Sequence, residues 1–436
     1  MSLKETLLTR YFTLRNLFVI GNLALLAFLL AAIVKDQNRE WKKYQREYFR
    51  REKSRLKEDL SRATTEEAKA PLAKQLALIR SQSVRIRQLM APPLDRYDRC
   101  VTCHLGYDPV LSPANQTPYA DLPYAAKANE VHRTHAPEKY ACTVCHEGQG
   151  LATTVQAAHG RVRHWEKPLR VGLLLQASCA KCHSNLYDEK AMPFTTAWRR
   201  GETIFKEKGC IGCHQIHGQG GPISVDLAEE TADKPLSRID FSHTDLPEEE
   251  HTLANWIRLH LVRDPWTLVP GDPKGEFNEE PIAPSGMPFF NLSEADAEAV
   301  TTFVLSLGRD QIPMEFTAPV SSLRVEPVGK TAVERGRKVY EKFGCAACHA
   351  PDGSGGTRNF NYVNGTEPNL KKAVATYTKE ELVEKLNKGV SPVGKADPKG
   401  PTPSLYMPAW KDKIKGADMD DLVTYLFSIA EKQEEW

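Results

Sequence analysis

The pattern of apolar and polar positions begins with one long apolar run. Residues 17–34 are apolar apart from Gly21 and Asn22. As a helix this run would be about 27 Å long, which is near the thickness of the hydrocarbon core of a bilayer. The apolar core of a cleaved signal peptide is usually shorter. We therefore predict a retained transmembrane anchor within residues 1–35.

A highly charged segment with helical periodicity follows the apolar run. Its first half places four large side chains near one face: Trp41, Tyr44, Tyr48 and Leu56. After a break at residues 63–65, apolar residues recur at heptad-like spacing: Leu72, Leu76, Ile79, Ile86 and Met90. Pro92-Pro93 would end this second helix. We predict a charged helical hairpin or stalk over residues 36–94, packed against partner helices; the alternative is a solvated single helix.

Two segments in the second half of the chain repeat with an offset of 135 residues, namely 201–210 and 336–345. Each begins with a glycine on a short helical pattern. Later in each copy a Met-Pro pair precedes an apolar helical pattern, at residues 292–307 and 417–430. We expect two all-α domains, 196–308 and 331–436, joined by a proline-containing linker over 309–330. The predicted fold class is mainly α.

All ten cysteines of the chain occur in five Cys-x-x-Cys-His motifs. The motifs are Cys100/Cys103/His104, Cys142/Cys145/His146, Cys179/Cys182/His183, Cys210/Cys213/His214 and Cys345/Cys348/His349. This spacing lets two thiols reach the two vinyl groups of one porphyrin, and the histidine then ligates the iron. A zinc half-site or a redox pair shares only the Cys-x-x-Cys part. We predict five covalently bound haem c groups, each histidine being a proximal ligand, and no disulfide.

Haem c attachment fixes the expected location of the chain. Because attachment takes place outside the cytoplasm in bacteria, everything after residue 100 should be exported, on the periplasmic side of a single span. The basic residues after the span would favour the opposite orientation: Lys35, Arg39, Lys42, Lys43 and Arg46. The haem requirement outweighs that statistical bias. The formal net charge of +2 and the lack of a basic stripe give no indication of nucleic-acid binding.

Residues 95–195 carry three haem motifs, a density too high for three separate cytochrome folds. We expect a loop-rich trihaem module in which each iron takes a second histidine. Four candidates are available: His132, His135, His159 and His164. Spacing suggests His135 or His132 for the first haem, His159 for the second, and His164 or His132 for the third.

Two family resemblances extend this interpretation. The stretch from His135 through Cys142-Thr-Val-Cys-His-Glu-Gly-Gln-Gly to His159 and His183 resembles membrane-anchored multihaem cytochromes found beside Rieske and cytochrome b subunits in bacterial respiratory chains. The resemblance covers roughly residues 95–310. It implies a quinol-oxidising complex as the membrane partner.

The two repeated segments resemble class I cytochromes c. That resemblance implies Met287 and Met407 as distal iron ligands, and a close crossing of the first and last helices at the small residue of each repeat. It also implies that the carbonyls of Pro222 and Pro368 orient the proximal histidines. We interpret His260 as structural.

These ligands predict the direction of electron flow. Methionine ligation raises the potential of a haem, so electrons should pass from the trihaem module to the C-terminal domain and on to a soluble cytochrome or oxidase. The alternatives are a subunit that feeds a terminal oxidase, alternative complex III or an extracellular acceptor. A multihaem oxidoreductase would need an open iron position, whereas the sequence offers a distal ligand for every haem. We therefore expect an electron carrier rather than an enzyme.

Overall fold

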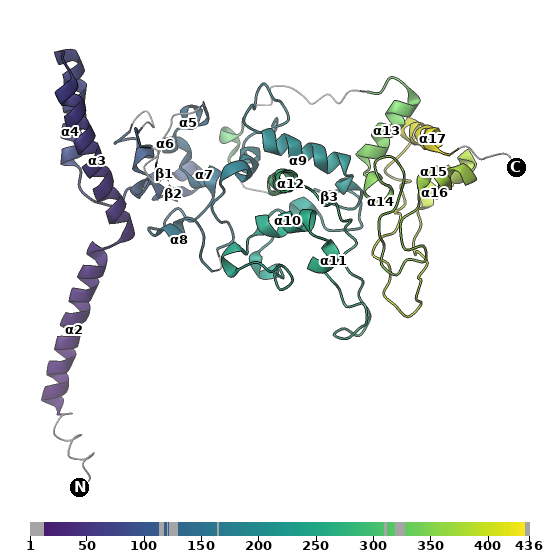
Figure 1. Cartoon of the computed structure of the whole chain (residues 1–436), viewed down its shortest axis with the longest axis horizontal. Helices are drawn as coiled ribbons and strands as arrows, with labels where there is room; N and C mark the ends of the chain where they lie inside the picture. The colour runs from purple at the N-terminus through teal and green to yellow at the C-terminus, as the bar shows by residue number, and fades with distance from the viewer. Residues whose placement is uncertain are drawn as a thin grey trace, which may run out of the picture. The chain divides into compact units, whose positions relative to one another are not determined.

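The computed structural model describes residues 13–112, 117–119, 121, 130–163, 165–308, 312–318 and 328–431 (Figure 1). About 51% is helix and 5% is strand, which confirms the predicted mainly-α fold. The chain divides into two compact units, Met1–Arg161 and Val162–Trp436, and each is described by itself.

The first unit begins with helix α2, Leu14–Gln37. Its side chains are almost all exposed, and within the described residues it is the one helix long and apolar enough to cross a membrane. The amide of Asn22 donates to the Phe18 carbonyl at 2.8 Å. This hydrogen bond satisfies one donor of the polar side chain within the helix itself. The helix is compatible with the predicted single-pass anchor.

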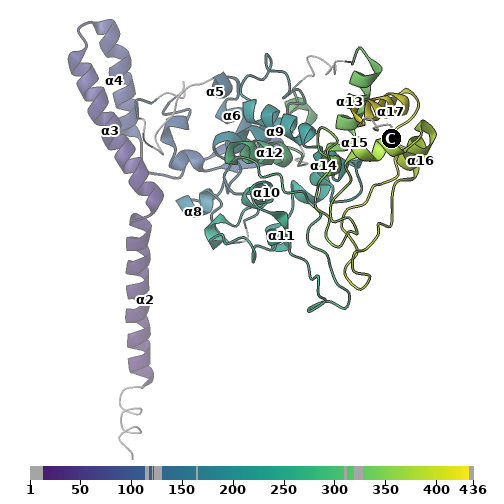
Figure 2. The ribbon, with the colours of Figure 1, turned by 45° about the vertical axis from the view of Figure 1, so that its right-hand side comes forward.

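Helices α3 (Glu40–Arg62) and α4 (Glu66–Ser81) form a hairpin, and Figure 2 shows the two side by side. The side chain of Thr65 caps α4 by accepting from the Ala68 amide. A buried cluster joins the two helices to the chain around the first haem motif: Tyr48, Phe49, Leu56, Leu76, Ile79, Leu105 and Leu111. The hairpin is therefore packed against the first motif and is not a solvated single helix.

The prediction that the second helix continues to Met90 is wrong. The helix ends at Ser81, and Ile86 and Met90 are exposed. The Gln45 side chain exchanges hydrogen bonds with the backbone of Arg85, and the backbone of Arg87 pairs with the Thr102 hydroxyl. These contacts hold the segment extended.

The rest of the first unit consists of short elements. Strands β1 (Leu89–Ala91) and β2 (Arg96–Asp98) pair antiparallel around the 3₁₀ turn Pro92–Leu94. The remaining elements are η2 Cys100–Thr102, η3 Leu105–Tyr107, α5 Glu130–Thr134, α6 Pro137–Tyr140, α7 Thr143–His146 and α8 Val155–Ala158. A buried ion pair between Arg87 and Asp108, at 2.8 Å, fastens this region to the segment that follows the hairpin.

The second unit begins with the third haem motif, at the end of η4 (Gly172–Lys181). Ala177 is buried in the core of the helical domain that follows. The side chain of Gln176 accepts hydrogen bonds from the backbone amides of Ala197 and Trp198, and so caps α9. The structure thus divides the predicted 95–195 module between its two compact units.

The first helical domain, residues 196–308, is built on the crossing of α9 (Thr196–Glu207) and α12 (Glu294–Leu305). A Cβ on Gly201 would lie 2.0 Å from the Ala299 carbonyl oxygen, so the crossing requires glycine. Its other elements are η5 Cys210–Gly212, β3 Gln215–Ile216, β4 Gln219–Gly220, the π-turn Leu227–Thr231, η7 Leu236–Arg238, η8 Glu248–Glu250, α10 Leu253–Val262 and α11 Pro265–Leu268. The short 3₁₀ turn η9, Met314–Phe316, lies in the predicted linker, of which residues 309–311 and 319–327 lie outside the described part of the chain.

The second helical domain, residues 328–431, repeats the crossing with α13 (Ala332–Lys342) and α17 (Ala417–Ile429). Gly336 stands at the crossing, where a Cβ would lie 1.9 Å from the Asp421 carbonyl oxygen. The other elements are α14 Ala346–His349, α15 Leu370–Ala373, η10 Val374–Thr376 and α16 Lys379–Lys388. Both terminal helices start and end within two residues of the predicted helical patterns.

Candidate haem-binding sites

The fifth motif lies in a cavity whose donors fit haem c. Cys345, Cys348 and His349 line it together with Met407. The remaining wall is largely apolar and includes Tyr340, Val374, Trp410, Leu422 and Leu426. The space between these residues, open solvent included, measures about 1100 Å³. Two thiols, an imidazole and a thioether therefore face one apolar space, which is the donor set that a Met/His-ligated haem c needs.

His349 is oriented by a backbone carbonyl. Its Nδ1 lies 3.1 Å from the Pro368 oxygen, so an N–H there donates to that carbonyl and Nε2 remains for a metal. This is the contact predicted for Pro368. Burial lowers the pKa of His349, which keeps the ring in the neutral form that binds iron. Burial also raises the pKa of the Cys345 thiol to about 12.

In the fourth motif, as in the fifth, a backbone carbonyl orients the histidine, but it belongs to a residue other than the predicted one. His214 Nδ1 lies 2.9 Å from the carbonyl of Val225, not that of Pro222, so the prediction for Pro222 is wrong. The tight β3–β4 turn brings Ser224 back to donate to the Cys213 carbonyl, and this contact moves the orienting carbonyl three residues beyond Pro222. Met287 packs against the domain core together with Cys210.

His260 lies within the same domain on α10. Its Nδ1 is 2.8 Å from the Trp256 carbonyl, and the two rings meet edge to face with centres 4.4 Å apart. These contacts fix the orientation of the ring, and the structural interpretation of His260 stays a prediction.

In the first motif, His104 has a second histidine beside it. The ring centres of His104 and His159 lie 6.3 Å apart, with a tilt of 35° between the rings. With metal–nitrogen bonds of about 2 Å and about 1.2 Å from nitrogen to ring centre, two imidazoles on opposite sides of one metal have centres about 6.4 Å apart. The two rings therefore have the separation of a bis-histidine pair. Spacing along the chain had suggested the second motif for His159.

The contacts of the other three candidate distal histidines do not assign them to a particular haem. The His132 ring packs edge to face on Tyr107, with centres 5.2 Å apart. His135 Nδ1 lies 3.0 Å from the Val131 carbonyl, an arrangement that leaves its Nε2 for a metal. His164 lies outside the described residues. Ligation of the second and third haems by these residues stays a prediction.

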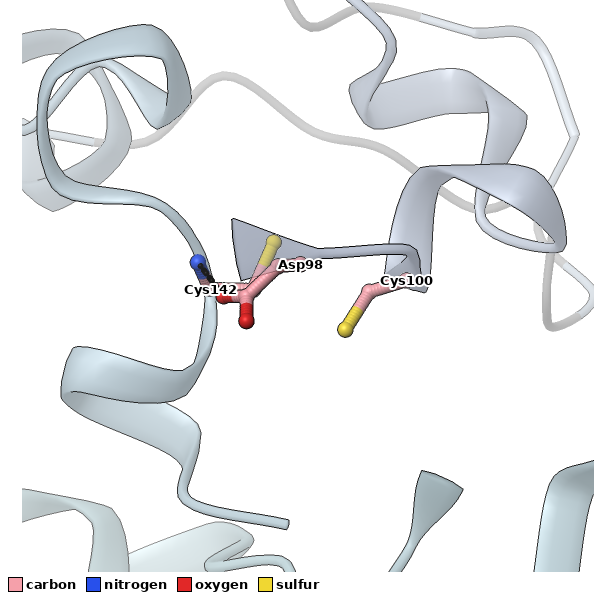
Figure 3. Close-up of side chains that lie close together, drawn as sticks. All are labelled: Asp98, Cys100 and Cys142. Carbon is pink, nitrogen blue, oxygen red and sulfur yellow. Dashed lines mark hydrogen bonds between the residues drawn. The ribbon is translucent and has the colours of Figure 1, made fainter. Parts of the chain in front are cut away.

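The second motif, which ends with His146 on α7, is held against the first by Asp98. The carboxylate accepts from the backbone amides of Cys142 and Thr143, both at 2.6 Å, and from the Thr143 hydroxyl at 2.8 Å. Donor atoms of Asp98, Cys100 and Cys142 all lie within 4.8 Å of one another (Figure 3). Because the carboxylate is already occupied by hydrogen bonds, we interpret this cluster as the meeting of two attachment motifs. The feature of the sequence that indicates this contact is Asp98, two positions before Cys100.

The other thiol of the second motif, that of Cys145, is not a member of this cluster. Cys142 is the N-cap residue of α7, whereas Cys145 lies within the helix and is half-buried. The pKa of the Cys142 thiol is raised first by its hydrogen bond with Cys100 and then by burial, and Cys145 adds a smaller contribution. The structure thus brings the Cys142 thiol against the first motif. Attachment of the second haem to Cys145 stays a prediction.

The third motif, Cys179, Cys182 and His183, contacts the later segment 312–318 of the same unit through its backbone. The carbonyl of Cys182 accepts from the amide of Ala318 at 2.8 Å. Burial raises the pKa of both thiols of this motif. Burial likewise raises the pKa of Cys103, the second thiol of the first motif, to about 12.

The family comparison agrees with this geometry. Residues 198–308 and 333–430 each match the family model for cytochrome c. The second half of the chain therefore contains two cytochrome c domains. They carry covalently bound haem c and give this part of the protein a role in electron transfer. Searches of curated proteins and of solved structures gave no match.

Proposed function

We propose that this protein is a membrane-anchored electron carrier with five haem c groups. The observation that carries the proposal is the fivefold Cys-x-x-Cys-His motif, of which two copies lie in the cytochrome c domains. The other three precede them and use every remaining cysteine of the chain. Haem would supply one-electron chemistry at each motif. The residues of the protein would hold, orient and shield the haem.

The proposed axial ligands follow from the contacts around each motif. His104 and His159 would ligate the first haem, since their rings have the separation of a bis-histidine pair. His214 with Met287 and His349 with Met407 would ligate the fourth and fifth. His132, His135 and His164 remain the candidates for the sixth position of the second and third haems.

We propose that electrons enter at the first three haems and leave from the fifth. Bis-histidine haems generally have lower potentials than Met/His haems, so this order is downhill. The resemblance of the region around residues 135–183 supports a quinol-oxidising complex with cytochrome b and Rieske subunits as the donor. The anchor helix α2 supports a donor in the membrane. The acceptor would be a soluble cytochrome or an oxidase.

The test is purification of the full-length protein in mild detergent, followed by three measurements. Quantitative haem analysis should give five haems per chain, and ferric spectra should be low-spin throughout. Mass spectrometry of the co-purifying proteins should find cytochrome b and Rieske subunits.

Each measurement can refute a separate part of the proposal. Fewer than five haems would refute the haem count. A high-spin haem that binds small ligands would favour an oxidoreductase. Co-purification with oxidase subunits alone, or with no partner, would refute the quinol-oxidising donor.

A further inference from the structure

The two cytochrome c domains touch through their haem-attachment motifs. The sulfur atoms of Cys213 and Cys348 lie within hydrogen-bonding distance, one from each domain. In haem c each of these sulfurs is bonded to a former vinyl group at the edge of its porphyrin. A contact between these two cysteines is therefore a contact between the attachment edges of two haem sites.

Two glycines make this approach possible. A Cβ on Gly212 would lie 2.2 Å from the Gly344 carbonyl oxygen, and a Cβ on Gly344 would lie 2.1 Å from the Gly212 nitrogen. Both contacts are with backbone atoms, so no side chain could rotate to relieve them. The motif itself does not require glycine, because Ala347 occupies in the fifth motif the position that Gly212 occupies in the fourth.

Further contacts join the two cytochrome c domains around the Gly212–Gly344 contact. Arg358 donates to both carboxylate oxygens of Asp264, at 2.7 and 2.8 Å, and its guanidinium lies 4.2 Å from the centre of the Trp266 ring. The Ser404 hydroxyl donates to the Pro284 carbonyl at 2.9 Å.

The first cytochrome c domain also completes a wall of the second domain's haem site. Gly212 and Ile223 line the cavity that contains His349 and Met407. The interface thus includes the haem sites and is more than a contact between outer surfaces.

We infer that Gly212 and Gly344 are positioning residues that hold the fourth and fifth haem sites edge to edge, so that the two haems behave as one coupled pair. The inference rests on that part of the proposed function which places haem at both motifs. Exchange within the pair is balanced, because one iron goes from ferrous to ferric as the other goes from ferric to ferrous. No bond is made or broken, and no proton or further reactant is required.

The first unit contains a related contact built from different residues. The sulfur atoms of Cys100 and Cys142, from the first and second motifs, lie within 4.8 Å of each other, and Asp98 rather than glycine joins them. Thiols of successive motifs therefore meet at two places along the chain.

The test uses the full-length holoprotein and electron paramagnetic resonance of its fully oxidised state. In the wild type, the signals of the two Met/His haems should show spin–spin coupling. Gly212→Ala should keep five haems per chain, because alanine is accepted at this motif position, but it should abolish the coupling by pushing the motifs apart. The matched control is Lys413→Ala, which removes a contact with the Gly220 carbonyl at the rim of the same interface and should leave the coupling intact.

Several outcomes would overturn the inference. Uncoupled signals of the two Met/His haems in the wild-type protein would overturn it, whether or not the Gly212→Ala variant folds. Unchanged coupling in Gly212→Ala with five haems present would show that the glycine contact does not position the pair. A Cys213–Cys348 disulfide found by mass spectrometry would assign the contact to a different chemistry. A count below five haems with coupling preserved would refute the proposed function alone.

Discussion

Substituting Gly336 by alanine tests the helix crossing that supports the fifth haem site. A Cβ there would lie 1.9 Å from the Asp421 carbonyl oxygen and 2.7 Å from the Tyr425 Cβ. Ordinary van der Waals contacts begin at 3.4 Å, so α13 and α17 would have to separate by about 1.5 Å. Overpacking of this kind costs about 1–3 kcal/mol. Alanine gains about 1 kcal/mol in helix propensity.

The steric cost should exceed the propensity gain, because the clash is with backbone that cannot rotate away. Separation would also strain the paired hydrogen bonds from Arg335 to the Asp421 carboxylate, at 2.7 and 2.8 Å. We expect a net loss of up to about 2 kcal/mol, which corresponds to an up to roughly 30-fold larger equilibrium constant for opening of the domain.

The assay is hydrogen exchange of α13 and α17 followed by mass spectrometry, since the slowest amides report the free energy of opening. Lys338→Ala is the matched control, because Lys338 is an exposed position of the same helix and should leave exchange nearly unchanged. If Gly336→Ala exchanges no faster than this control, the close crossing is not what stabilises the domain.

Three further predictions concern other parts of the chain. His159→Ala should leave five haems per chain but make the first one high-spin in ferric spectra; an unchanged low-spin spectrum would exclude the pairing of His159 with His104. Thr378→Ala removes the side chain that accepts from the Glu381 amide at the start of α16, and should lower the free energy of unfolding of that domain by about 1 kcal/mol in urea titrations. Backbone amides, that of Phe277 foremost, lower the pKa of Asp272 to about 2, so its contribution to stability is complete above pH 3.8 and is lost as pH falls toward 2. Asp272→Asn should therefore remove part of the acid destabilisation seen in unfolding curves between these pH values.

The sequence predicted two kinds of feature well. Helices α12 and α17 follow from apolar periodicity, which depends on residues close together in the chain. The crossings at Gly201 and Gly336 and the contact from His349 to Pro368 join residues farther apart, and the resemblance to class I cytochromes c implied them.

The errors arose where residues distant in sequence determine the conformation. The heptad-like spacing of Ile86 and Met90 favoured a helix, but Gln45 and Thr102 bind the backbone of residues 85–87 and hold it extended. Periodicity within the segment contains no information about those two partners. Tertiary hydrogen bonds thus outweighed a local helical pattern.

The proposed pairing of His159 with His104 also depends on residues distant in the chain, and it bears on the proposed entry point of electrons. Glu40, three residues beyond the end of α2, accepts through its carboxylate from the amide of Val155, the first residue of α8. His159 is the residue that ends α8, and its ring lies beside His104. At the other side of the site, Gln45 on α3 donates to the Thr102 carbonyl within the first motif. The charged hairpin that continues from the apolar helix therefore contacts both of the segments that present these histidines, and this connection supports the first haem as the acceptor of electrons from a membrane donor.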